Sequence, residues 1–226
     1  MRLNKYIAQQ GYASRRKADE LIKSSQVKVN NKVVTEMGVM INPDKDKVVI
    51  SGEPLEQNKQ VITTYILNKP KGVVTTASDP QGHKTVLDFV PEKPRVFPCG
   101  RLDAETMGLV LLTNDGNLCY QLTHPKFEHK KTYLVEGVCR NPKYATDELK
   151  KGVIHLPDGD AKIDDLKVIK SSGNKLNFFI TIHEGRNRIV RRICAKLGVE
   201  VINLTRTELG EYSLEGIAPG KFKKVS

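Results

Sequence analysis

The apolar positions near the N-terminus follow first a helical and then a strand pattern. Helical spacing over residues 3–7 predicts one short helix, and Ser14 is a suitable N-cap for a second. Two valine-rich segments then flank an asparagine pair at 30–31, which predicts a tight hairpin because Asn tolerates positive φ. Residues 53–60 are polar and aperiodic, so we expect an N-terminal domain at 1–52 followed by a linker.

Residues 61–226 form a second block in which strand patterns outnumber helical ones. Apolar and β-branched runs predict strands at 61–67, 73–76, 109–112, 131–138, 162–169, 176–183 and 199–206. Amphipathic spacing predicts helices near 115–123, 143–151 and 188–197. Because the strands do not alternate regularly with helices, we expect an α+β fold with a mainly antiparallel mixed β-sheet and flanking helices.

Composition adds an excess of positive charge to this picture. Thirty-seven Lys and Arg residues stand against 26 Asp and Glu residues, for a formal net charge of +11. This excess favours a polyanionic partner, nucleic acid first, although charge alone is equally compatible with another basic soluble protein. Four arginines also cluster between residues 186 and 192, as a nucleic-acid surface requires.

Cysteine spacing and hydropathy argue against several other classes. The four cysteines are far apart, without a C-x-x-C pair or a matching histidine cluster, which predicts reduced thiols and no metal site at Cys99, Cys119, Cys139 and Cys194. The N-terminus lacks the apolar stretch of a signal peptide, and the longest strongly apolar run, 109–112, is too short to span a bilayer. We therefore expect a cytoplasmic protein without a membrane partner.

A candidate phosphate-binding face lies on the two N-terminal helices. Two basic residues share one side of the first helix, and three open the second, where backbone N–H groups also favour phosphate. With the capping serine, these residues are Arg2, Lys5, Ser14, Arg15, Arg16 and Lys17. A solvated helix face explains the same spacing equally well.

This N-terminal block resembles an S4 RNA-binding domain. The resemblance covers about residues 1–50 and rests on RLNKYIA at 2–8, SRRKAD at 14–19 and VKVNNK at 27–32. It implies that the basic face binds RNA, without naming the RNA.

The most specific segment of the second block is GRLDAETMGLVLLTNDG at 100–116. Taken alone, it predicts a loop that carries Asp103, then a buried strand and an Asn-Asp-Gly turn. A loop aspartate is more often a helix cap or a surface ion-pair partner than a catalyst. Local sequence therefore favours a structural role for Asp103.

The wider pattern reverses that interpretation, because the chain resembles the RsuA/RluB/RluF family of ribosomal RNA pseudouridine synthases. Supporting segments follow in order: LNKPKG at 67–72, FPCGRLD at 97–103, HPK at 124–126, KTYLV at 131–135 and EGRNRIVRR at 184–192. The resemblance implies an isomerisation in which the C1′–N1 bond of uridine breaks, the base turns and C1′ joins C5. Such a reaction needs no cofactor, but it requires the base to be flipped out of the RNA.

The resemblance also implies the roles of individual residues. Asp103 would be the catalytic carboxylate, which attacks C1′ or assists removal of the 2′ hydrogen, and Arg191 would pair with it. Tyr133 would stack on the flipped uracil, an interaction of about 1–3 kcal/mol per base. Ile189 departs from the family, which often has Gln there, and so alters a polar contact. The remaining basic positions are candidate phosphate contacts: Lys69, Lys71, Arg101, Arg186, Arg188 and Arg192.

The substrate RNA stays open at this point. Overall similarity favours 23S rRNA of the large subunit, as for the RluB type, with an RluF-like enzyme or an RsuA-like enzyme of 16S rRNA as alternatives. A protein of another class, a non-catalytic RNA-binding factor in ribosome assembly, is a further alternative. No oligomerisation pattern is visible in the sequence, so we expect a monomer.

Overall fold

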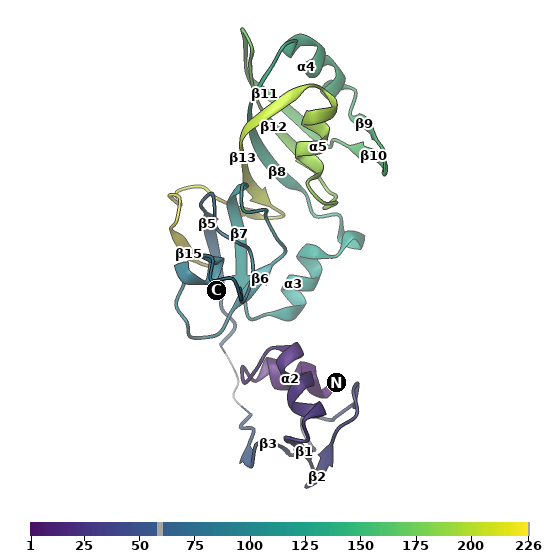
Figure 1. Ribbon diagram of the computed structural model, residues 1–226, viewed down its shortest axis with the longest axis vertical. Helices are drawn as coiled ribbons and strands as arrows, with labels where there is room; N and C mark the ends of the chain where they lie inside the picture. The colour runs from purple at the N-terminus through teal and green to yellow at the C-terminus, as the bar shows by residue number, and fades with distance from the viewer. Residues whose placement is uncertain (58–60, 226) are drawn as a thin grey trace. The chain divides into compact units, whose positions relative to one another are not determined.

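Two compact units make up the structure, a computed structural model that describes residues 1–57 and 61–225 (Figure 1). The first unit comprises Met1–Ile62 and the second Thr63–Ser226. Residues 58–60 of the expected linker lie outside the described residues. Each unit has its own hydrophobic core.

The N-terminal unit combines two helices with a small antiparallel sheet. The helices are α1 (Leu3–Gln9) and α2 (Arg15–Lys23), and the Ser14 hydroxyl caps α2 by accepting the Lys17 backbone N–H at 3.1 Å, as predicted. The strands run in the order β2-β1-β3-β4, with bounds β1 (Val27–Val29), β2 (Lys32–Val34), β3 (Val48–Ile50) and β4 (Glu53–Pro54). Apolar side chains from both layers fill the core between them, among them Leu3, Ile22 and Ile50.

The β1–β2 hairpin turns at the asparagine pair. Asn30 and Asn31 have φ angles of 50 and 66°, which confirms the predicted tight turn. Strand β4, in contrast, lies inside the segment 53–60 that the sequence pattern predicts to be linker, and it pairs with β3. A polar, aperiodic segment can extend a sheet because backbone groups, rather than side chains, form the ladder.

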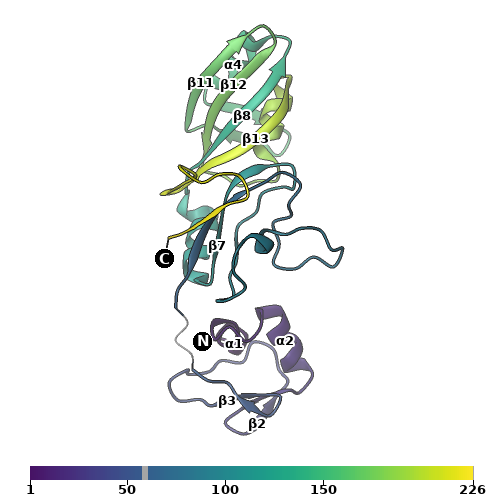
Figure 2. The same cartoon turned by 90° about the vertical axis from the view of Figure 1, so that its left-hand side faces the viewer.

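A long sheet organises the second unit. Its strands run in the order β11-β12-β8-β13-β7-β5-β15, with β6 beside β7 and β14 beside β13, and Figure 2 shows β11, β12, β8 and β13 side by side. Among the described strands, every pair in this sheet is antiparallel except β13 with β7, which confirms the mainly antiparallel mixed sheet. The bounds are β5 (Thr64–Lys69), β6 (Phe97–Cys99), β7 (Met107–Thr113), β8 (Lys131–Cys139), β11 (Asp165–Ser172), β12 (Lys175–Ile182), β13 (Val199–Leu209), β14 (Tyr212–Ser213) and β15 (Phe222–Lys224).

Helices pack against this sheet in two separate apolar clusters. The larger cluster includes α4 (Pro142–Lys150) and α5 (Ile189–Lys196), and the smaller includes α3 (Gly116–Thr123). Alternate residues of β7 serve the two clusters, Val110 the larger and Leu109 the smaller. Burial on both sides explains why the sequence of β7 is an unbroken apolar run. Shorter elements complete the unit: η1 (Val86–Phe89), η2 (Pro125–Phe127), β9 (Val153–Leu156) and β10 (Gly159–Lys162).

Three predicted strands differ from the structure. Residues 73–76 form no regular strand and contribute one bridge, between Val74 and Thr85, because the Val74 backbone is hydrogen-bonded to Lys84 and Val86 instead of to a strand of the sheet. The segment 162–169 spans the end of β10 and the start of β11. The strand expected at 61–67 begins at Thr64.

The two halves of the long sheet meet at a short parallel contact between β7 and β13. Thr205 pairs with Met107, and Arg206 pairs with Gly108. Gly108 has a φ of +105°, and a Cβ at this position would lie 2.3 Å from the Arg206 carbonyl oxygen, so both the conformation and the contact require glycine. The buried Arg206 guanidinium donates from Nε and Nη2 to the Leu109 carbonyl at 2.9 and 2.7 Å.

Gly108→Ala should destabilise the protein by more than about 2 kcal/mol, because the added methyl group meets the backbone of a paired strand. For a chain of this size, that loss lowers the midpoint of thermal unfolding by roughly 4 °C or more. Gly82→Ala is the matched control, since Gly82 has a φ of +75° and an added Cβ there would have nothing within 4 Å; it should cost about 1 kcal/mol. Equal midpoints for the two variants, measured by calorimetry, would contradict the close contact.

Candidate active site

A cleft of about 800 Å³ opens beside the β7–β13 junction. Residues from the segment 99–106 line one side, and the other lining residues come from the end of α3 and the turn that follows it, the start of β8, the segment 183–191 and the end of β13. All three residues expected to be catalytic contribute to its wall: Asp103, Tyr133 and Arg191. The structure thus brings together residues from distant parts of the chain.

The loop that carries Asp103 is fastened through its backbone on both sides of that residue. On one side, the Thr75 hydroxyl donates to the Leu102 carbonyl at 2.8 Å and accepts the Leu102 N–H at 3.3 Å. On the other side, the Gly72 N–H donates to the Ala104 carbonyl at 2.8 Å. These bonds hold the backbone of the two residues that flank Asp103, and so they restrict where its carboxylate can lie.

Lys69 belongs to this fastening and not to an RNA-binding surface. Its side chain is fully buried, and Nζ donates to the carbonyls of Pro70, Val73 and Ala104 at 3.0, 2.8 and 3.1 Å. Burial lowers the pKa of Lys69 to about 8, which leaves the amine mostly protonated at pH 7 with three N–H donors for three acceptors. The prediction of a phosphate contact is therefore wrong for Lys69.

Arg188, rather than Arg191, pairs with Asp103 in the structure. Arg188 Nη1 lies 3.3 Å from Asp103 Oδ2, and both side chains are partly exposed. Arg188 precedes α5 and has a φ of 51°, a left-handed conformation that is uncommon for a residue other than glycine. Arg191, in the first turn of α5, reaches the loop backbone instead: Nη2 donates to the Glu105 carbonyl at 3.0 Å and lies 3.5 Å from Thr106 Oγ1. This corrects the expected Arg191–Asp103 pair.

Two further cations in the cleft wall, the half-buried Lys131 and the buried Arg206, were not found from the sequence. Lys131, two residues before Tyr133 in β8, donates from Nζ to the carbonyls of His129 and His183 at 3.1 and 3.0 Å, and burial lowers its pKa. Arg206, which anchors the sheet junction, also lines the cleft. Lysine and arginine side chains in a strand are usually exposed, so the sequence around Lys131 and Arg206 does not indicate that these side chains turn inward.

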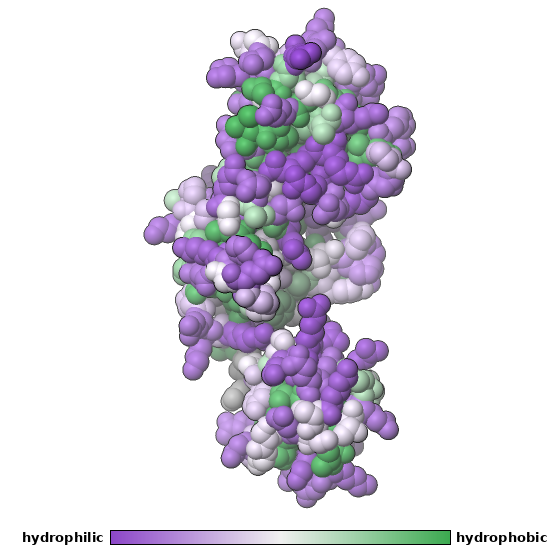
Figure 3. All heavy atoms as spheres, viewed as in Figure 1, coloured by the Kyte–Doolittle hydropathy of each residue, from purple (hydrophilic) through white to green (hydrophobic). Residues whose placement is uncertain are grey.

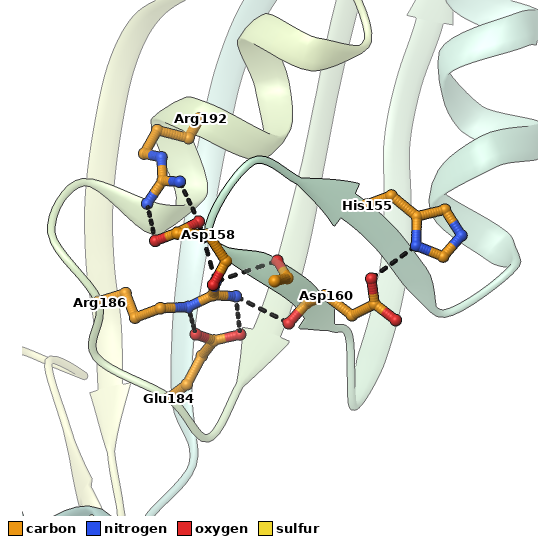
Figure 4. A network of polar contacts seen from close by, with 7 residues as sticks. His155, Asp158, Asp160, Glu184, Arg186 and Arg192 are labelled. Atoms are coloured by element: carbon orange, nitrogen blue, oxygen red, sulfur yellow. Dashed lines mark hydrogen bonds and ion pairs between the residues drawn. The ribbon is translucent and has the colours of Figure 1, made fainter.

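Arg186 and Arg192 fasten the β9–β10 hairpin to the region around the start of α5 (Figure 4). The N–H groups of Arg186 are engaged by the Glu184 carboxylate and by oxygen atoms of the hairpin turn, those of Asp158, Gly159 and Asp160. Arg192 Nη1 lies 2.9 Å from Asp158 Oδ2, and this guanidinium lowers the pKa of Asp158 to about 2. Protein carboxylates hold both arginines in the structure, and their expected contact with phosphate stays a prediction.

Other predicted phosphate contacts lie at the surface. Arg101 is exposed at the cleft, and Lys71 is exposed with Nζ 3.3 Å from Glu105 Oε2. In Figure 3 hydrophilic residues gather over α5 and the segment before it.

The helices within residues 1–57 and 61–225 include none with the length and apolar character that a membrane span requires.

The N-terminal unit places its candidate residues around the starts of α1 and α2. Arg2, Arg15, Arg16 and Lys17 are exposed, and Lys5 and Ser14 are half-buried. Lys17 Nζ is 3.0 Å from Glu20 Oε2, and the Ser14 hydroxyl is occupied as the helix cap. The contact of these residues with RNA stays a prediction.

Known proteins resemble the chain over its whole length. Residues 63–196 match the family model for RNA pseudouridylate synthase, and residues 1–46 match the S4 domain. Ribosomal large subunit pseudouridine synthase B of Bacillus subtilis is 43% identical, with 100% of this chain and 92% of the relative covered. Dual-specificity RNA pseudouridine synthase RluF of Escherichia coli is 36% identical, with 100% and 76% covered. A crystal structure of a pseudouridylate synthase matches with a TM-score of 0.66 at 29% identity, over 100% of this chain and 96% of that one.

The fold, the cleft and these matches define the class as an RNA-modifying isomerase with an S4 domain. The chain belongs to the RNA pseudouridylate synthase family. The resemblance inferred from the sequence segments is thereby confirmed.

Lys69→Met should lower thermal stability and catalytic rate together, because it leaves three buried carbonyls without their donor beside the Asp103 loop. We expect a stability loss of about 2 kcal/mol or more, with RNA affinity changed little. Lys71→Met, two residues away at the surface, is the control and should leave stability nearly unchanged. A Lys69→Met protein of wild-type stability that binds RNA weakly would instead support a phosphate contact for Lys69.

Proposed function

We propose that the chain converts a uridine of 23S ribosomal RNA to pseudouridine, as a monomer in the cytoplasm. The main support is the convergence of Asp103, Tyr133 and Arg191 on one cleft. The large-subunit name of the Bacillus subtilis relative favours 23S over 16S rRNA. The N-terminal unit contributes affinity for the RNA through its basic residues.

Asp103 acts at the ribose C1′ of an extruded uridine in this proposal. The C1′–N1 bond breaks with its electron pair on the base, the base turns, C1′ joins C5, the C5 proton leaves to solvent, and N1 takes up a proton. The carboxylate either attacks C1′ or helps to remove the 2′ hydrogen. Because the loop is hydrogen-bonded on both sides of Asp103, the carboxylate has a fixed approach to the sugar.

Tyr133 holds the detached uracil in the cleft. Its side chain is largely buried, 9% exposed, and belongs to the cleft wall. Stacking on this ring offsets much of the few kcal/mol spent in unstacking the base from the RNA. A base held in this way keeps its place during the turn, while the cleft limits access of water, which would otherwise hydrolyse the intermediate.

Arg188 and Arg191 differ in exposure, and we assign them different roles. Arg188, partly exposed beside Asp103, is placed to contact the ribose-phosphate backbone of the entering RNA. Arg191 is less accessible, and among the described residues its buried Nε has no hydrogen-bond acceptor. An unsatisfied buried donor is costly, so an oxygen atom of the substrate that reaches this side chain meets a hydrogen-bond donor already in place.

Asp103→Asn should abolish the reaction, by at least about 10³-fold, because the amide can neither attack C1′ nor accept a proton. Binding of RNA should persist because the amide keeps the shape of the side chain. The assay is tritium release from 23S and 16S transcripts that carry [5-³H]uridine, with filter binding for affinity. Glu105→Gln, which changes a surface carboxylate in the same loop, is the control. Activity of Asp103→Asn close to wild type would contradict the proposal. Tritium release by the wild-type chain from the 16S transcript alone would identify 16S rRNA as the substrate instead.

Arg191→Gln should lower the single-turnover rate at saturating RNA, whereas Arg188→Gln should mainly raise the RNA concentration that gives half-maximal rate. The reason is that an interaction made in the transition state affects the rate constant, and one made with ground-state RNA affects binding. Each effect should be about tenfold or more. The reverse pattern would show that Arg188, which pairs with Asp103 in the structure, is the catalytic cation.

A further inference from the structure

A group of aromatic rings lies on α3 and the turn that follows it. Ring centroids are 4.9 Å apart for Tyr120 and His124, 5.7 Å for Tyr120 and Phe127, and 6.3 Å for Phe127 and His129. We call these four residues the ring cluster. The Tyr120 and Phe127 side chains are 48% and 38% exposed, which is high for aromatic side chains that also contact each other.

The ring cluster does not serve the core of the fold. The apolar cluster under α3 is built from other residues of this region, chiefly Leu118, Cys119 and Leu122. Within the described part of the chain, Tyr120 and Phe127 are not among the members of that cluster. Their aromatic character therefore needs an explanation other than packing, and an exposed aromatic group of this kind is typical of a binding surface.

The cluster is continuous with the active-site cleft. His124 and His129 belong both to the ring cluster and to the residues that line the cleft with Asp103. The rings therefore extend from the cleft wall outward along α3 and η2, the teal segment that precedes β8 in Figure 1.

Positive charge accompanies the rings. Lys126 Nζ lies 5.1 Å from the Tyr120 centroid and 4.7 Å from the Phe127 centroid. Lys130 follows in the same turn, which also holds one acid, Glu128. An ammonium group beside accessible rings offers a phosphate partner and a stacking surface within one nucleotide's reach.

We propose that the ring cluster stacks an unpaired RNA base next to the target uridine, with Lys126 on the adjoining phosphate. This inference rests on the proposed function, because it takes the uridine of an RNA as the occupant of the cleft. Removing a base from a stack leaves its neighbours without a partner. Aromatic side chains accept any base, since each has a π face, so the cluster supports the opened RNA without reading its sequence. RNA is favoured over a protein partner by the adjacent lysines and by continuity with the cleft.

The test combines changes in the protein with changes in the RNA. The variants are Phe127→Leu and Tyr120→Leu, singly and together, which keep apolar volume but remove the rings. Tyr144→Leu, an exposed tyrosine on α4, is the matched control. The RNA is a synthetic stem-loop that spans a uridine modified by the wild-type chain, made intact and with an abasic site at the 5′ or the 3′ neighbour. Affinity is measured by filter binding in the Asp103→Asn background, and rate by single-turnover tritium release.

The double variant should bind the intact stem-loop about 5-fold or more weakly, with the saturated rate changed much less. On RNA abasic at the stacked neighbour, wild type and variant should bind equally, because the base that the rings hold is gone. Equal losses of affinity on intact and abasic RNA, or no loss on either, would overturn the proposal. Wild-type RNA binding by the double variant in vitro together with altered ribosomal particles in cells would overturn it in favour of a protein partner. Failure of the proposed function is distinct, because the wild-type chain would then release no tritium from any rRNA.

Discussion

The close contact between Gly108 and Arg206 determines how the catalytic unit is built. It joins the two halves of the long sheet through a two-residue parallel contact, and a side chain at position 108 would collide with the opposite backbone. The buried Arg206 guanidinium also donates two hydrogen bonds to the Leu109 carbonyl. The cleft forms beside this junction, so one backbone contact decides which distant residues can meet in the site.

Lys69 and Lys131 connect this junction to the loops around the cleft through hydrogen bonds to backbone carbonyls. Lys69 ends β5 next to the junction and binds three carbonyls around the Asp103 loop, and Lys131 binds two carbonyls at the start of β8. A buried charge is costly unless it is well paired, so the fully buried Lys69 keeps its three carbonyl acceptors around it. The partly exposed Asp103 thus lies on a loop bound by the buried Lys69, while Arg188 and Arg101 remain at the surface.

Local features of the fold could be predicted from the sequence, and the features that failed depend on distant contacts. The Ser14 cap and the asparagine hairpin follow from a few neighbouring residues, and both are present. Lys69 and Lys71 are indistinguishable in sequence, yet one turns inward because its acceptor at Ala104 is 35 residues away. Arg188 and Arg191 differ for the same reason, since the partner Asp103 lies 85 residues before Arg188. The sequence segments identified Asp103 through family resemblance, but they could not show which arginine faces it.

The most direct measurement is a map of pseudouridine in both ribosomal RNAs from cells that lack this protein. The account predicts that one position or a small set of positions in 23S rRNA loses pseudouridine, that 16S rRNA is unchanged, and that the wild-type gene restores the missing modification. Unchanged maps of both RNAs in the deleted cells would contradict the central claim that this chain is a 23S pseudouridine synthase.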